Sequence, residues 1–131
     1  MPPQTCHRIL YVEDEEDIRC ITKIALEEIG GFILTLCKNG REAIDAAKEF
    51  TPDLLLLDVM MPDMDGIMTL AELRKLPHLQ TVPVIFMTAK VQLDEVMEYK
   101  KLGVIDVIMK PFDPITIADH IKTVFMDYYG H

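Results

Sequence analysis

The sequence predicts an α/β domain built on a five-stranded parallel sheet with helices on both faces. Short apolar runs alternate with longer amphipathic stretches, five times each. These runs are short, rich in aliphatic residues and mostly without a two-residue alternation, which is typical of strands that are covered on both faces, as in a parallel sheet. Glycine, proline or aspartate marks several of the points where one element gives way to the next. This order of elements favours a doubly wound (βα)5 architecture.

The five apolar runs are the predicted strands. Each is four to six residues long, shorter than a typical helix, and consists mainly of leucine, isoleucine, valine and methionine. The predicted strands are residues 9–12, 32–36, 54–57, 82–87 and 104–109.

The stretches that follow the runs are predicted to be helices, because their apolar residues recur three and four positions apart. The fourth helix is expected over residues 91–101. The inner faces expected for the others are Ile18, Ile21, Ala25 and Ile29 in the first helix, Ala43, Ala47 and Phe50 in the second, Leu70 and Leu73 in the third, and Ile117, Ile121, Val124 and Tyr128 in the fifth.

Turn-forming residues predict the helix boundaries. Gly30-Gly31 should end the first helix, and Gly103 should stop the fourth. The third helix should begin near Asp65-Gly66 and end before Pro77. In Asp113-Pro114, an N-cap residue precedes a proline at the first helical position, so the last helix is expected to begin there.

Parallel strands joined by helices imply right-handed crossovers. The expected strand order is 2-1-3-4-5, as in flavodoxin-like sheets, with ligands bound beyond the carboxyl ends of the strands where the order reverses. The sequence has no linker, low-complexity tract or repeat. We therefore expect residues 1–131 to form a single domain.

The composition disfavours several classes of protein. A formal net charge of −9 opposes direct binding to nucleic-acid phosphates and suits a divalent cation or a basic partner. The three cysteines include no C-x-x-C motif, which is typical of reduced thiols in a cytoplasmic protein. Neither a signal peptide nor an apolar run of about 20 residues is present, so we expect no membrane insertion.

Polar side chains follow four of the predicted strands. Glu13 and Asp14 follow the first, Asp58 ends the third, Thr88 the fourth and Lys110 the fifth. In a parallel sheet these ends meet at one edge, so three carboxylates would share a pocket. Like charges this close destabilise a site unless a cation joins them, and oxygen ligands favour Mg²⁺.

The same residues predict a reaction. Asp58 could act as a nucleophile, while the Thr88 hydroxyl and the Lys110 ammonium suit the oxygens of a phosphoryl group. The predicted chemistry is Mg²⁺-assisted phosphoryl transfer onto a carboxylate.

Four segments, in order, resemble the receiver domain of two-component response regulators. They are YVEDEED, LLLLDVMMPDMDG, PVIFMTAK and VIMKPFDP, and the resemblance covers nearly the whole chain. It implies that Asp58 is the phosphoacceptor and that Thr88 and Lys110 hold the phosphoryl oxygens. The implied ligands of Mg²⁺ are Glu13, Asp14, Asp58 and the backbone carbonyl of Met60. The resemblance also implies a cis peptide bond before Pro111, which is uncommon for proline in general.

Two positions depart from the pattern of that family. Glu13 stands where aspartate is common, and its longer side chain would reach the metal through water. Val107 stands three residues before the lysine, where many receivers have a tyrosine or phenylalanine that turns inward on phosphorylation. An aromatic switch is therefore absent from this position.

The resemblance implies a phosphorylation-dependent signalling switch that receives its phosphoryl group from a histidine kinase or a histidine phosphotransfer protein. Such a protein is not an enzyme beyond its own phosphorylation and dephosphorylation. Only enough sequence for one helix follows Lys110, so we expect no output domain in this chain and an output through protein–protein binding. The alternatives are a relay between kinase and phosphotransfer protein, and a phosphate-independent interaction module.

Overall fold

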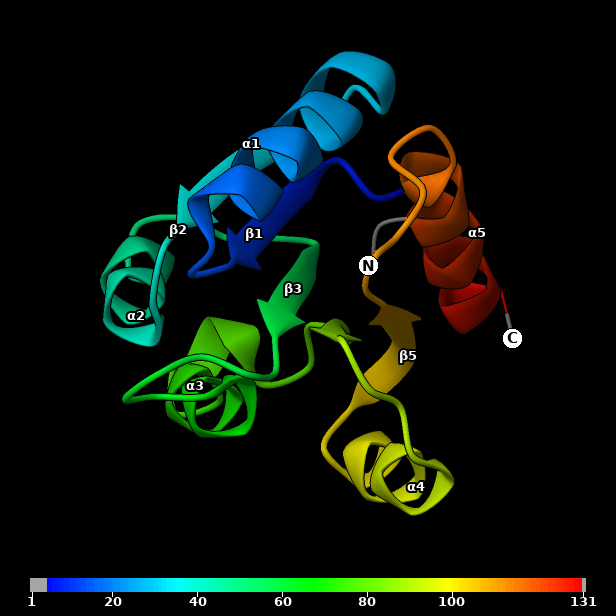
Figure 1. Ribbon diagram of the computed structural model, residues 1–131. Coiled ribbons are helices and arrows are strands. Elements are labelled where there is room, and N and C mark those ends of the chain that lie inside the picture. The colour runs from blue at the N-terminus through cyan, green and yellow to red at the C-terminus, as the bar shows by residue number, and fades with distance from the viewer. Residues whose placement is uncertain (1–4, 131) are drawn as a thin grey trace.

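The computed structural model of the protein describes residues 5–130. One parallel sheet has the order β2-β1-β3-β4-β5, which confirms the predicted fold class (Figure 1). Its strands are β1 (Arg8–Val12), β2 (Ile33–Cys37), β3 (Leu54–Asp58), β4 (Val84–Thr88) and β5 (Val104–Met109). The helices are α1 (Glu16–Lys23), continued by a π-helical segment (Ile24–Ile29), then α2 (Gly40–Ala47), α3 (Gly66–Leu73), a short 3-10 helix (Pro77–Leu79), α4 (Leu93–Lys101) and α5 (Ile117–Tyr129). Within residues 5–130, no helix has the length and apolar character needed to cross a membrane.

Helices cover both faces of the sheet, with α2, α3 and α4 on one side and α1 and α5 on the other (Figure 1). The central strand β3 shows why its sequence is a run of leucines. Leu55 and Leu57 pack in the hydrophobic cluster under α2 and α3, whereas Leu54 and Leu56 pack in the cluster under α1 and α5. All four are fully buried, and each such burial stabilises the fold by about 1.5–3 kcal/mol.

The inner face of the first helix differs from the prediction. Ile21 and Ile29 are 48% and 51% exposed. The buried residues are Thr22, Ala25 and Leu26. Thr22 tolerates burial because its hydroxyl donates to the carbonyl of Ile18 at 2.7 Å. The last turns are π-helical, so a 3.6-residue period carried through Ile29 no longer identifies the inner face.

The last helix also differs from the prediction in two respects. It begins at Ile117, because Asp113 caps a separate turn in which its carboxylate accepts the Ile115 N–H at 2.9 Å. Its inner face continues from Ile121 to Phe125 at four-residue spacing, whereas Tyr128 is half exposed. The ring of Phe125 then packs on that of Tyr129, with centroids 4.8 Å apart.

Arg74, just after α3, ties three segments together. Its Nη1 donates to the carbonyls of Leu79 at 2.6 Å and Val82 at 2.7 Å, and its Nη2 donates to the carbonyl of Leu102 at 3.4 Å. We expect Arg74→Ala to lower the free energy of unfolding, measured in urea, by about 2 kcal/mol, because these acceptors lose a charged donor. Arg74→Lys should recover little, since an ammonium cannot reproduce the guanidinium fork. An equal loss in Lys75→Ala, at the exposed neighbouring lysine, would contradict this role.

Candidate functional site

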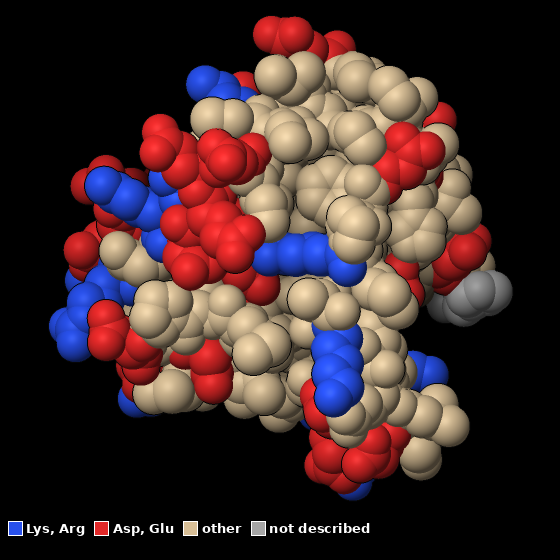
Figure 2. Space-filling view, viewed as in Figure 1, with Lys and Arg blue, Asp and Glu red and all other residues tan. Residues whose placement is uncertain are grey.

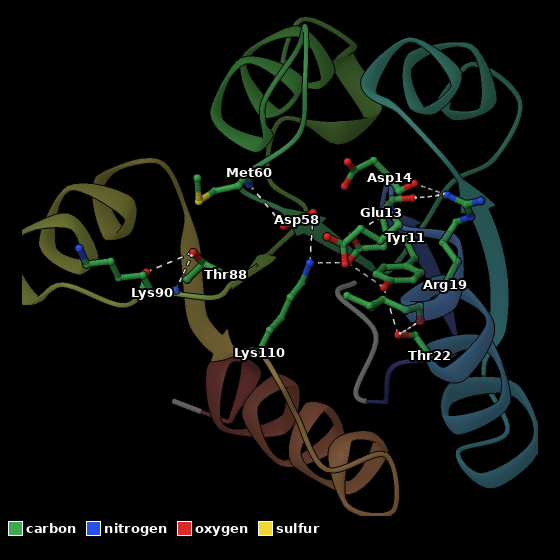
Figure 3. A network of polar contacts seen from close by, with 12 residues as sticks. Tyr11, Glu13, Asp14, Arg19, Thr22, Asp58, Met60, Thr88, Lys90 and Lys110 are labelled. Carbon is green, nitrogen blue, oxygen red and sulfur yellow. Dashed lines mark hydrogen bonds and ion pairs between the residues drawn. The ribbon is translucent and has the colours of Figure 1, made fainter.

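The carboxyl ends of β1, β3, β4 and β5 meet at one edge of the sheet. Strand register places Val12 beside Leu57 and Thr88 beside Met109, so the residues that follow these strands lie at the same level. Figure 3 shows Lys110 reaching between Asp58 and Glu13. The peptide bond that follows Lys110 is cis, as the resemblance implied.

Three carboxylates form the centre of the site. Ligand oxygens of Glu13, Asp14 and Asp58 all lie within 4.8 Å of one another. Glu13 is fully buried and Asp58 is 2% exposed. Oδ1 of Asp14 is also buried and accepts no hydrogen bond from residues 5–130. This set of hard oxygen donors, one of them unpaired, fits a magnesium ion.

Met60 was the fourth predicted ligand, through its carbonyl. It lies in the turn two residues after Asp58, and its N–H donates to Oδ1 of Asp58 at 3.3 Å. The backbone of Met60 therefore borders the carboxylates, while its side chain is exposed.

Lys110 is closer to Glu13 than to the predicted phosphoacceptor. Its Nζ lies 2.6 Å from Oε1 of Glu13 and 3.2 Å from Oδ2 of Asp58. Burial alone lowers the pKa of Lys110, but its hydrogen bond to Glu13 and the charges of both carboxylates outweigh this and raise the pKa. Burial, followed by the hydrogen bond and charge of Glu13, raises the pKa of Asp58 to about 8, although Lys110 opposes the rise. One lysine thus only partly compensates this group of carboxylates.

Thr88 lies at the end of β4 and is 4% exposed. Its hydroxyl donates to the carbonyl of Lys90 at 3.1 Å and accepts the N–H of Lys90 at 3.3 Å. Figure 3 shows this pair to one side of Asp58. The hydroxyl is therefore engaged with its own loop in this state.

Sequence reasoning missed a second layer of polar side chains behind the carboxylates. Arg19 donates to the carbonyls of Glu13 at 2.9 Å and Asp14 at 2.8 Å, and so holds the loop after β1. The hydroxyl of Tyr11 lies 3.1 Å from Thr22 and 3.4 Å from Glu13. A tyrosine within an otherwise aliphatic strand is the signal that could have revealed this contact, because a buried phenol needs a partner.

The surroundings of the site are acidic on one side. Figure 2 shows acidic side chains gathered over the loop after β1 and the start of α1. The residues that follow Asp14 there, Glu15, Glu16 and Asp17, are all exposed. This surface would attract cations and basic partners.

Val107, the second departure from the family pattern, is half-buried and packs against the cluster under α2, α3 and α4. A cavity of about 280 Å³ lies next to it, lined also by Val96 and Lys100 of α4. Because residue 107 is a valine, it places no aromatic ring in this cavity.

The order of these elements and this edge of the sheet match a known family of proteins. The model of the response regulator receiver domain matches residues 9–122. The chain belongs to this receiver family. It is 38% identical over 107 residues to the regulatory protein AtoC of Escherichia coli, and 35% identical over 123 residues to the transcriptional regulatory protein CseB of Streptomyces avermitilis. Those alignments cover 82% and 94% of this chain.

The aligned part makes up only 23% of the length of AtoC and 50% of the length of CseB. Among solved structures, the chemotaxis protein CheY4 of Vibrio cholerae is similar to this chain over nearly its whole length. The two structures superpose with a TM-score of 0.84 at 26% identity, covering 91% of this chain and 98% of CheY4.

Proposed function

We propose that this receiver domain is a phosphorylation-dependent switch in which Asp58 accepts the phosphoryl group. The observation that supports this is the position of Asp58: buried at the carboxyl end of β3, within 4.8 Å of two further carboxylates and 3.2 Å from a lysine ammonium. A carboxylate oxygen attacks phosphorus, the bond from phosphorus to the donor breaks, and the electron pair leaves with the donor. Lys110 and Thr88 then hold the phosphoryl oxygens.

Glu13, Asp14, Asp58 and the carbonyl of Met60 would hold Mg²⁺. When bound, this ion would neutralise the carboxylates and the incoming phosphoryl oxygens. Oδ1 of Asp14 is buried and accepts no hydrogen bond from the described part of the chain, which supports its role as a ligand. The protein catalyses only its own phosphorylation and dephosphorylation and is otherwise no enzyme.

The proposed donor is a histidine kinase or a histidine phosphotransfer protein in the cytoplasm. The proposed output is a change in affinity for a downstream protein, because a signal needs different binding free energies in the two states. A relay to a further phosphotransfer protein would use the same Asp58 chemistry. We propose no direct contact with nucleic acid, since the net charge is −9.

Acetyl phosphate provides the test. With Mg²⁺ the intact mass of the protein should rise by one phosphoryl group, and chelation of Mg²⁺ should prevent the rise. A protein that stays unmodified while Mg²⁺ and acetyl phosphate are both in excess would instead be a phosphate-independent interaction module.

A further inference from the structure

Two hydroxyl groups lie behind the carboxylate cluster, on the α1 side of the sheet. Tyr11, in β1, is fully buried, and so is Thr22, in α1. The Tyr11 hydroxyl lies 3.1 Å from Oγ1 of Thr22 and 3.4 Å from Oε1 of Glu13. Figure 3 shows the phenol group between Glu13 and Thr22. These contacts link the proposed metal site to α1.

The number of available protons determines which of Tyr11, Thr22 and Glu13 donates and which accepts. Oγ1 of Thr22 lies 2.7 Å from the carbonyl oxygen of Ile18, which has no proton, so Thr22 donates its own hydrogen there. Tyr11 is then the donor toward both Thr22 and Glu13, with one hydrogen for two acceptors. The shorter distance assigns that hydrogen to Thr22, because 3.4 Å is long for a hydrogen bond between oxygens.

Lys110 already donates a hydrogen bond to Glu13, so Glu13 does not require one from the Tyr11 hydroxyl. Its Nζ lies 2.6 Å from the same Oε1 that the Tyr11 hydroxyl approaches. In the proposed function, the ammonium moves to the phosphoryl group. Oε1 of the fully buried Glu13 then loses its nearest donor, and a buried carboxylate oxygen without a donor is costly. The Tyr11 hydroxyl is already within reach.

We propose that Tyr11 is a positioning residue whose hydroxyl turns from Thr22 to Glu13 when Lys110 leaves the glutamate. This inference rests on the proposed function, because it requires Lys110 to bind a phosphoryl group. Tyr11 contacts Glu13 and none of the reacting atoms. When the hydroxyl rotates toward Glu13, Thr22 loses the hydrogen bond that it accepts from Tyr11, so the change at the site reaches α1.

Tyr11→Phe removes only the hydroxyl. Its matched control is Tyr99→Phe, because Tyr99 is also buried and donates to a carboxylate, that of Glu95, at 2.9 Å. The dissociation constant of Mg²⁺ would be measured by calorimetry, alone and with beryllofluoride as a phosphoryl mimic.

With beryllofluoride, we expect Tyr11→Phe to weaken Mg²⁺ binding about tenfold, as is usual when a partner of a metal ligand is lost. With Mg²⁺ alone the change should be much smaller, since Lys110 still holds Glu13. Tyr99→Phe should match the parent in both conditions. Equal weakening by Tyr11→Phe in both conditions would indicate a merely structural role and would overturn the proposal.

NMR of the parent protein tests the inference without a substitution at Tyr11. With ¹³Cζ-labelled tyrosine, the Tyr11 signal should shift when Mg²⁺ and beryllofluoride are added, whereas the Tyr99 signal should stay. Thr22→Val removes the competing acceptor and should bind Mg²⁺ with beryllofluoride at least as tightly as the parent. A stationary Tyr11 signal, or a loss in Thr22→Val equal to that in Tyr11→Phe, would overturn the proposal.

The Mg²⁺ measurements distinguish failure of the proposed function from failure of the proposed role of Tyr11. If the parent shows no beryllofluoride-dependent binding of Mg²⁺, the proposed function is overturned and this inference with it. If parent and Tyr11→Phe both bind normally, only the role of Tyr11 is overturned.

Discussion

Asp58→Asn is expected to abolish phosphorylation by acetyl phosphate. An amide has nearly the shape of the carboxylate but lacks a nucleophilic oxygen, so the reaction loses its acceptor. The variant should remain folded, because burial and Glu13 raise the pKa of Asp58 to about 8 and its charged form is therefore costly. Removing that charge should raise the free energy of unfolding at alkaline pH without Mg²⁺. Intact mass would report the phosphorylation, and urea unfolding the stability.

Asp63→Asn is the matched control for this change. Asp63 lies in the exposed loop after β3 with a positive φ of 67°, a conformation that asparagine adopts readily. It should be phosphorylated like the parent. If Asp58→Asn still gains the full phosphoryl mass, another residue is the acceptor and the proposed role of Asp58 is wrong.

Lys110→Met is expected to lower the free energy of unfolding by about 3 kcal/mol at alkaline pH without Mg²⁺. Lys110 forms ion pairs with both Glu13 and Asp58, and its loss leaves two buried carboxylates unpaired. Because the pKa of Asp58 is higher in the folded protein than in the unfolded chain, its contribution to stability is present in acid and is lost as the pH rises through about 8. Lys110 opposes this loss, so the deficit of the variant should be largest in alkali.

Urea unfolding at about pH 5 and about pH 9.5 measures this effect, since the raised pKa of Asp58, about 8, lies between the two. The deficit should shrink at the acidic pH, and Mg²⁺ should restore part of it in alkali. Lys90→Met, at an exposed lysine in the loop after β4, should change stability by less than about 0.5 kcal/mol. A deficit that is the same at both pH values would mean that Lys110 acts through packing.

The fold was predictable because a strand that is buried on both faces has a nearly continuous run of apolar residues. The run Leu54–Leu57 could not lie on an exposed surface, and the structure buries each of its leucines completely. Since strands of this kind lie parallel, the polar residue after each run had to reach the same edge. The sequence therefore predicts that Glu13, Asp58 and Lys110 lie together, and in the structure Lys110 is within ion-pair distance of both carboxylates.

Helix faces were predicted less well, for a local reason. A repeat of 3.6 residues assumes regular turns and apolar inner residues. The π-helical turns at Ile24–Ile29 break the first assumption, and buried Thr22 breaks the second. In α5 the error was one of phase, since Phe125 rather than Val124 continues the spacing of Ile117 and Ile121.

The sequence alone determined the class of fold, the edge of the sheet where the candidate site lies and the residue types gathered there, because each depends on the order of elements along the chain. Only the tertiary structure decided how those groups pair. Lys110 lies nearer to Glu13 than to Asp58, the Thr88 hydroxyl bonds to its own loop, and the Tyr11 hydroxyl lies nearer to Thr22 than to Glu13. Most of these partners come from different elements, so the distances between them depend on how those elements pack, which the spacing of residues along the chain does not specify.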